Sequence, residues 1–325
     1  MSWLSKYLGW FVLAFLVLFP LGVGPLFSDF YVSLMIRIFV FAIVLMGFDI
    51  LVRCGLVSFG HAMFFGTGGY IAGVLLKYFS TSIWLMLAAS LLVNAALGYA
   101  LGFLFIRTRG IYFAFLTFAF AEFFYLFFNA WRVLGGADGL AGIPKPSLDI
   151  LWDLGNQKVY YYFTLILVVL GYLVARHIFH SAFGRVLVAI RQNEDRTMFL
   201  GYDVHRCMRM AFLISGIFGG LGGSLLIAYQ SFVSPAVYYW GLSGEILVMD
   251  LLGGMGTLIG PIIGSAFIIS VGDVISSWVA KTWLMILGSL YVICIIFFPE
   301  GMMGIVTRFG RIGQRHAVTG NKEPQ

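Results

Sequence analysis

The amino-acid sequence predicts an all-α polytopic membrane protein with about ten transmembrane segments, and three observations support this. First, 61% of the 325 residues are hydrophobic and only 10% are charged, whereas about half of an ordinary soluble domain is apolar. Second, continuous apolar runs of about 20 residues recur along the chain, long enough to cross a membrane as helices. Third, the 40 glycines suit closely packed membrane helices. The runs do not alternate as the strands of a β-barrel would.

The apolar runs and their interruptions place the spans along the chain. The N-terminal run after Lys6 lacks a convincing small-residue cleavage site, so we expect a retained first span rather than a signal peptide. The spans are expected at 8–27, 32–52, 56–77, 83–106, 110–131, 158–178, 208–230, 243–256, 259–279 and 282–299. The eighth run is short and ends at glycines, which predicts a half-helix or a re-entrant segment.

Basic residues predict the orientation of these spans. With ten crossings and a cytoplasmic N-terminus, the outer side receives five of the 20 basic residues: Lys77, Arg132, Lys145, Lys158 and Lys281. Arg37 lies within the second span, and the remaining 14 lie on the cytoplasmic side. This asymmetry follows the positive-inside rule, so both termini are expected in the cytoplasm.

The same map gives one transmembrane domain, 1–307, and a basic cytoplasmic tail, 308–325. The longest outer connection is about 132–157, and the longest cytoplasmic one is about 181–209. Cys54, Cys207 and Cys294 have no metal-ligand spacing and are interpreted as packing residues. His177 and His180 lie three residues apart without further ligands, so we expect no metal site.

Residues 185–209 hold eight of the 34 Asp, Glu, Lys and Arg side chains of the chain. Asn193 can cap a short helix there, and Gly201 suits its left-handed stop. Glu194 and Asp195 suit the first turn of that helix because acids complement the helix dipole. Arg196 stands where a capping box would need Glu or Gln. A helix over 193–200 is therefore expected in the longest cytoplasmic connection.

The composition of this helix permits two interpretations. Its start is charged, whereas Met198, Phe199 and Leu200 at its end are apolar. A short exposed helix of this kind suits docking into a groove on another protein. A loop that only fixes orientation, with its apolar residues against lipid headgroups, fits the composition equally well.

Interruptions of the spans predict where a solute would cross, because irregular backbone at membrane depth occurs only against protein or water. The first is CGLVSFGHAMFFGTGGY. Its candidate path residues are Ser58, Gly60, His61, Gly66 and Gly69. A helix break here would turn backbone amides and Ser58 toward a pathway. Close helix packing through the glycines, with His61 bonded to a neighbouring backbone, is the competing interpretation.

Intramembrane acids form the second group of path candidates, because such groups are costly and usually functional. Glu245 and Asp250 lie five residues apart in the short eighth span, so they share a helix but not a face. Asp250 is the deeper, and Glu245 near the outer mouth could instead cap the helix. Further acids are Asp49, Glu122 and Asp273, and Arg37 is expected to pair with one of these three.

Five blocks, taken in order over about 40–310, resemble membrane subunits of the branched-chain amino acid family of ABC transporters (the LivM type). They are GLVSFGHAMFFGTGGYIAGVL, IRTRGIYFAFLTFAFAEFF with GGADGLAGIP, SAFGRVLVAIRQNEDRTMFLGYDV, SGEILVMDLLGGMGTLIGPIIGSAF and FFPEGMMGIV. The third block departs from the family pattern at Ala182, Gln192 and Thr197, where Pro, Glu and Ala are usual.

The resemblance implies a permease subunit rather than an enzyme. The short cytoplasmic helix of such a subunit fits a cleft in a separate ATPase. The chain has no G-x-x-x-x-G-K-[ST] phosphate loop, so ATP and Mg²⁺ would bind the partner, and no cofactor is expected here. The implied coupling residues are Arg191, Asn193, Glu194, Asp195, Arg196, Met198, Phe199, Leu200, Gly201 and Asp203.

The implied importer comprises a second homologous permease subunit, two cytoplasmic ATP-binding subunits and an outer solute-binding protein, all at a bacterial inner membrane. No nucleic-acid partner is expected. The implied solutes are branched-chain or other hydrophobic amino acids, or alternatively urea or short amides. A different class, a proton-coupled secondary transporter using Asp250, Glu122 or Asp273, is the competing hypothesis. The mechanism of such a transporter does not require Met198, Phe199 and Leu200 to be exposed to the cytosol.

Overall fold

The structure is a computed structural model that describes residues 15–20, 29–147, 154–278 and eight isolated positions between 285 and 302. In this part, six helices are long and apolar enough to cross a membrane: α2 (Asp29–Val52), α4 (Ile83–Phe105), α5 (Ile111–Ala130), α6 (Gln157–His180), α9 (Val204–Gln230) and α11 (Gly260–Trp278). The predicted multi-pass helical class is confirmed. Most of the expected spans 8–27 and 282–299, and the tail 308–325, lie outside the described residues, so the count of ten stays a prediction.

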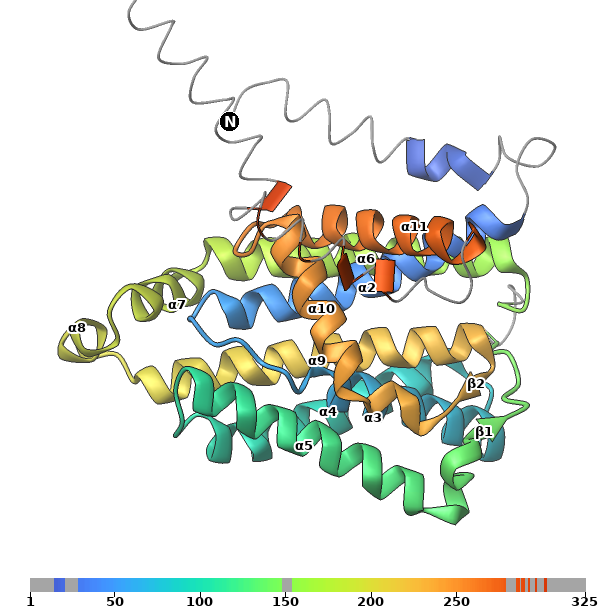
Figure 1. The fold of residues 1–325 in the computed structure, drawn as a ribbon, viewed down its shortest axis with the longest axis horizontal. Coiled ribbons are helices and arrows are strands. Elements are labelled where there is room, and N and C mark those ends of the chain that lie inside the picture. Colours follow the sequence, from blue (N-terminus) through green and yellow to red (C-terminus); the bar gives the residue numbers. More distant parts are fainter. Residues whose placement is uncertain are drawn as a thin grey trace, which may run out of the picture.

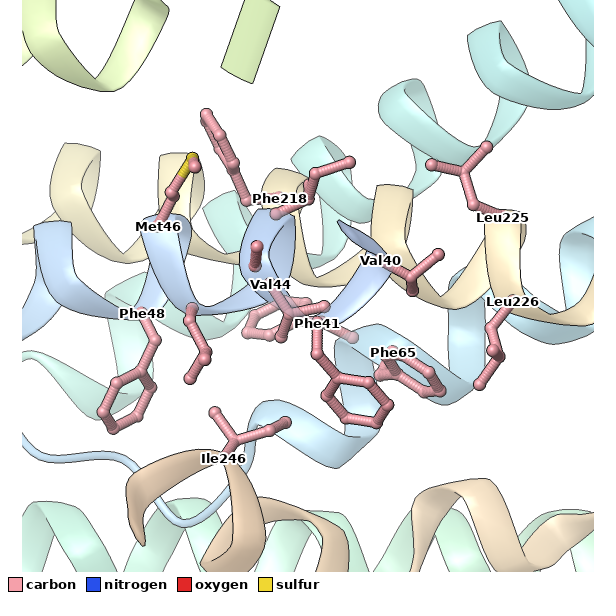
Figure 2. Packing of buried hydrophobic residues seen from close by; sticks show 14 of the residues in the cluster. Val40, Phe41, Val44, Met46, Phe48, Phe65, Phe218, Leu225, Leu226 and Ile246 are labelled. Atoms are coloured by element: carbon pink, nitrogen blue, oxygen red, sulfur yellow. The ribbon is translucent and has the colours of Figure 1, made fainter. Parts of the chain in front are cut away.

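The core of the bundle forms where α9 packs against α2, α4 and the shorter helix α3 (His61–Tyr78). Figure 2 shows buried side chains of this core, among them Val44 of α2 and Phe218 of α9, with the ring of Phe41 of α2 facing that of Phe65 of α3. Over their most apolar stretches, α2 is 89% buried and α9 72% buried, whereas α5 is only 17% buried. Most of the surface of α5 is therefore left to lipid or to other chains.

Glycines allow α3 and α9 to approach closely. A Cβ atom at Gly68 of α3 would lie 1.9 Å from the carbonyl oxygen of Gly220 in α9. A Cβ atom at Gly223 would likewise lie 1.9 Å from the carbonyl oxygen of Phe65. Only residues without a side chain permit this backbone-to-backbone contact, which is the usual basis of tight helix packing in membranes.

Two interruptions distinguish the fold from a simple bundle of full-length helices. The expected span 56–77 is wrong at its start, because residues 56–60 are not helical and α3 begins only at His61. Figure 1 shows the non-helical segment 53–60 leading from the end of α2 back toward the middle of the bundle. The expected short eighth span is confirmed as a short helix, α10 (Trp240–Gly253), of 14 residues.

The two ends of the bundle carry different structures (Figure 1). One end holds α7 (Ala182–Gln192) and α8 (Glu194–Phe199) within the connection from α6 to α9. The other end holds two short antiparallel strands, β1 (Leu140–Ala141) and β2 (Phe232–Val233). Beside them lie three 3-10 turns, η1 (Arg132–Leu134), η2 (Gly136–Asp138) and η3 (Pro235–Tyr238). We refer to these as the α8 end and the strand end.

Candidate functional site: the α7–α8 connection and the polar centre of the bundle

The short helix expected over 193–200 is confirmed as α8, together with its predicted cap and stop. The side chain of Asn193 accepts a hydrogen bond from the backbone N–H of Arg196 at 2.8 Å. Gly201 ends the helix with a φ of 89°, the left-handed conformation that favours glycine. Asp203 then caps α9 by accepting from the N–H of Arg206 at 2.9 Å. The Asn193 cap and the Gly201 stop thus define the two ends of α8.

The apolar end of α8 is exposed. The exposed fractions are 91% for Phe199, 72% for Leu200 and 49% for Met198. Thr197 is the one α8 residue that is buried, and its hydroxyl donates to the carbonyl oxygen of Asn193 at 2.9 Å. Three adjacent exposed apolar side chains on a capped helix form a surface of the kind that contacts a partner or a membrane.

Glu194 of α8 forms an ion pair that sequence reasoning missed. Its carboxylate accepts from Nη2 of Arg109 at 2.6 Å and from Nε at 2.9 Å. The hydrogen bond from Arg109 holds the pKa of Glu194 below its ordinary value. Arg109 lies 85 residues away in the turn between α4 and α5. Nothing in the local sequence could have identified this partner, whereas Asp195, the adjacent acid, is exposed.

Arg191 at the end of α7 lies beside a second group of charged residues, which consists of Asp49 and Arg53 around the backbone of Gly256. Its guanidinium Nη1 is 3.8 Å from the position that a Cβ atom on Gly256 would take. Gly256 belongs to the turn between α10 and α11, and its backbone N–H donates to Asp49 of α2. Its carbonyl oxygen accepts from Arg53 at 3.0 Å. Arg191 and Arg53 both interact electrostatically with Asp49, so this group joins α7, α2 and the α10–α11 turn.

The predicted path residues Ser58 and His61 lie in a fully buried polar junction at the start of α3. His61 Nε2 is 2.7 Å from the hydroxyl of Ser215 in α9. The N–H of Ala62 donates to the hydroxyl of Ser243 in α10 at 2.9 Å. The partner of His61 is therefore a side chain, whereas the competing interpretation expected backbone.

Side chains at this junction accept hydrogen bonds from backbone N–H groups that have no helical partner before α3 begins. The N–H of Phe59 donates to Thr117 of α5 at 3.1 Å, and the N–H of Gly60 donates to the hydroxyl of Ser58 at 3.1 Å. Unpaired amides at membrane depth would each cost several kcal/mol, so these side chains permit the break. Four elements thus meet at the start of α3: the 53–60 segment, α5, α9 and α10.

The candidate glycines are in close contact with neighbouring elements. A Cβ atom on Gly60 would lie 2.7 Å from the carbonyl oxygen of Thr117. One on Gly66 would lie 2.5 Å from the ring of Tyr238, and one on Gly69 would lie 2.8 Å from Ile227. These contacts account for the glycines by packing, and a role for them in a solute path stays a prediction.

The intramembrane acids have different environments. Both carboxyl oxygens of Asp250 are buried and have no hydrogen-bond partner among the described residues, and Asp250 interacts electrostatically with Asp49. One carboxyl oxygen of Glu122 on α5 is also buried without such a partner. Glu245, in the second turn of α10, interacts electrostatically with Arg37. The structure shows no hydrogen bond between any two of Asp250, Glu122 and Glu245.

The expected partner of Arg37 is identified. Its guanidinium forms an ion pair with Asp273 of α11, which ties α2 to α11 within the span region. This confirms that Arg37 pairs with one of the three further acids. Among the described residues, three other acids keep buried carboxyl oxygens without a hydrogen-bond partner: one oxygen each of Asp49 and Glu122, and both oxygens of Asp250.

These features define a class: a multi-pass helical membrane protein with broken helices at its polar centre and an exposed capped helix at one end. Residues 30–296 match the family described as the permease component of branched-chain amino acid transport systems. The chain belongs to this family.

Individual relatives agree with the family match. The chain is 30% identical over 272 residues to the high-affinity branched-chain amino acid transport system permease protein LivM of Salmonella typhimurium and to that of Escherichia coli. These matches cover 77% of this chain but 64% of each relative. The autoinducer 2 import system permease protein LsrC of Klebsiella pneumoniae is 26% identical over 155 residues, which are 46% of this chain and 42% of that protein. No solved structure matches the chain.

Proposed function

We propose that the chain is a membrane-spanning permease subunit of an ATP-driven importer, with ATP hydrolysis on separate subunits. The observation that carries the proposal is the exposed apolar end of α8, formed by Met198, Phe199 and Leu200. Side chains of this size gain free energy when they are buried, about 1.5–3 kcal/mol each. A rigid capped helix that presents them outside the bundle suits a cleft in a cytoplasmic ATPase.

The proposed solutes are branched-chain or other hydrophobic amino acids, as in the names of the two LivM relatives. Urea or short amides are the alternative for the same architecture. The proposed assembly contains a second homologous permease subunit, two ATPase subunits that bind ATP and Mg²⁺, and an outer solute-binding protein. Its proposed location is a bacterial inner membrane, with the α8 end in the cytoplasm, as the basic residues indicate.

A proton-coupled secondary transporter is the second candidate, and one observation favours it. Asp250 is fully buried, and neither of its carboxyl oxygens has a hydrogen-bond partner among the described residues; such a group can exchange a proton. The exposed end of α8 has no role in a transporter of this kind. The two candidates therefore differ in whether an ATPase binds at α8.

Co-purification from detergent-solubilised native membranes tests the proposal. We expect an ATP-hydrolysing partner to be recovered with the wild-type chain. Phe199→Asp combined with Leu200→Asp should lower its recovery about tenfold or more, because central apolar anchors dominate such interfaces. Val133→Asp is the matched control, since Val133 is 78% exposed at the strand end, and its recovery should equal that of the wild type. Absence of an ATPase with the wild-type chain would favour the secondary transporter.

A further inference from the structure

The inference concerns how α8 is connected to the membrane bundle. The helices that pack most closely on α8 are α7 and α9, which are also its neighbours along the chain. Among the described residues, the Arg109–Glu194 ion pair is the only hydrogen-bonded link from α8 to an element that is distant in sequence. Arg109 belongs to the turn that joins α4 to α5. Any movement of α8 that this pair transmits therefore arrives at the start of α5.

The geometry of the ion pair restricts movement of Glu194 relative to Arg109, so a displacement of one residue displaces the other. Two nitrogens of the Arg109 guanidinium bond the carboxylate of Glu194, and this planar two-point geometry fixes orientation as well as distance. A third nitrogen, Nη1, bonds the carbonyl oxygens of Ile106 and Thr108. The side chain is thereby held against its own turn. Lysine at this position could keep the charge but could not reproduce the two-point contact.

Helix α5 is suited to respond to such a displacement. It is the least buried of the six long helices over its most apolar stretch, so fewer contacts within this chain oppose its movement. Its strand end packs on η3, where the ring of Phe128 stacks on Tyr238 at 4.6 Å and Phe124 lies 5.8 Å from the same ring. Only Tyr239 separates η3 from α10. A shift of α5 at one end of the bundle therefore reaches α10 through aromatic contacts at the other.

The connection of α8 through α9 leads to a more buried element. α9 continues from α8 directly, but it is 72% buried over its apolar stretch and packs against α2, α3 and α4. Moving it would disturb the core, including the backbone contact between Gly68 and Gly220. Displacement of α5 requires less rearrangement of packed groups.

We propose that Arg109 is a positioning residue that passes movement of α8 to α5, so that the Arg109–Glu194 pair links the ATPase contact to the strand end. The inference rests on the proposed function, because closure of the ATPases is what moves α8. It assigns to Arg109 a role in coupling and none in solute contact.

The experiment measures the α5 displacement itself. Spin labels are placed at Tyr112→Cys in the first turn of α5 and at Met210→Cys in α9, both exposed, after Cys54, Cys207 and Cys294 are replaced by Ala. The complete complex with its co-purified ATPase is studied without nucleotide and with ATP plus vanadate. We expect the distance between the labels to shift by about 2 Å or more on nucleotide binding. Arg109→Gln should abolish this shift while the ATPase stays bound.

Two further variants keep the test specific. Arg107→Gln is the matched control, because Arg107 lies in the same turn, is exposed and forms no ion pair in the described structure; it should keep the shift. Arg109→Glu combined with Glu194→Arg should restore at least part of the shift that each single reversal removes. Arg109→Lys should restore less, because the two-point contact is absent.

The outcomes separate this inference from the proposed function. If no ATPase binds the wild-type chain, the proposed function fails and this inference fails with it. If an ATPase binds and Arg109→Gln shifts like the wild type, or if the wild type shows no shift, the link through Arg109 is wrong and the proposed function stands. Loss of ATPase binding in Arg109→Gln would also overturn the inference, because Arg109 would then be supporting the docking surface.

Discussion

Individual side chains at the α8 end illustrate how local and distant interactions contribute to one small helix. The cap by Asn193 and the stop at Gly201 are local, and both were predictable because helix ends have strong sequence preferences. The pairing of Glu194 with Arg109 joins residues 85 positions apart. A first-turn acid is explained equally well by the helix dipole, so the sequence offered no reason to look for a distant partner.

The Glu194–Arg109 pair predicts a pH dependence. The pKa of Glu194 is lower in the folded chain than its ordinary value, because Arg109 bonds the ionised carboxylate. A depressed folded-state pKa contributes stability above the unfolded-state pKa, and this contribution is lost as pH falls through the folded-state pKa. We expect the wild type to melt at a higher temperature than Glu194→Gln at about pH 7, with the difference shrinking as the pH falls below the ordinary pKa of glutamate, about 4.3.

Thermal unfolding of the detergent-purified chain measures this difference. Asp195→Gln is the control for loss of one negative charge in the same turn, because Asp195 is exposed and forms no ion pair in the described residues. Its melting temperature should follow that of the wild type at every pH. A Glu194→Gln variant as stable as the wild type at neutral pH would show that the ion pair contributes nothing to stability.

At the scale of elements, long apolar helices were predictable and interruptions were only partly so. The span over 32–52 corresponds closely to α2 because 24 consecutive residues are apolar enough to be helical and buried. The start of α3 was predicted several residues too early. Val57 and Phe59 are apolar enough to suggest helix. The hydroxyls of Thr117 and Ser243, distant in sequence, accept hydrogen bonds from the backbone N–H groups of Phe59 and Ala62, which allows the backbone to stay non-helical until His61.

The close approach of α3 and α9 predicts a position-specific effect of glycine replacement. Gly68→Ala would place a Cβ atom 1.9 Å from the carbonyl oxygen of Gly220, so the two helices must separate along their contact. Overpacking of this kind typically costs about 1–3 kcal/mol. We expect a clearly lower melting temperature and reduced yield of folded protein in detergent.

Gly171→Ala is the matched control for this prediction. Gly171 also lies within a long helix, α6, but a Cβ atom there would lie 3.5 Å from Phe218, which is ordinary van der Waals contact. Because alanine favours helix more than glycine does, this variant should be as stable as the wild type or slightly more so. Equal destabilisation by both variants would mean that helix propensity, and not the α3–α9 contact, determines the effect.

At the scale of the whole molecule, the arrangement of the helices predicts that the α8 end and the strand end lie on opposite sides of the membrane. Between Val133 at the strand end and Phe199 at the α8 end the described chain contains one long helix, α6, of 24 residues. Such a helix is about 36 Å long, enough to cross the hydrocarbon core once. The distribution of basic residues then predicts a cytoplasmic α8 end.

Site-directed labelling tests this orientation. In a chain whose three cysteines are replaced by Ala, Val133→Cys and Phe199→Cys introduce single thiols at side chains that are 78% and 91% exposed. A membrane-impermeant maleimide applied to intact spheroplasts should label Val133→Cys at once. It should label Phe199→Cys only after the membrane is opened, because the reagent cannot reach the cytoplasmic side. Labelling of both thiols from the outside would contradict the single crossing by α6. Labelling of Phe199→Cys alone would show that the orientation is the opposite one, in which no cytoplasmic ATPase could contact α8.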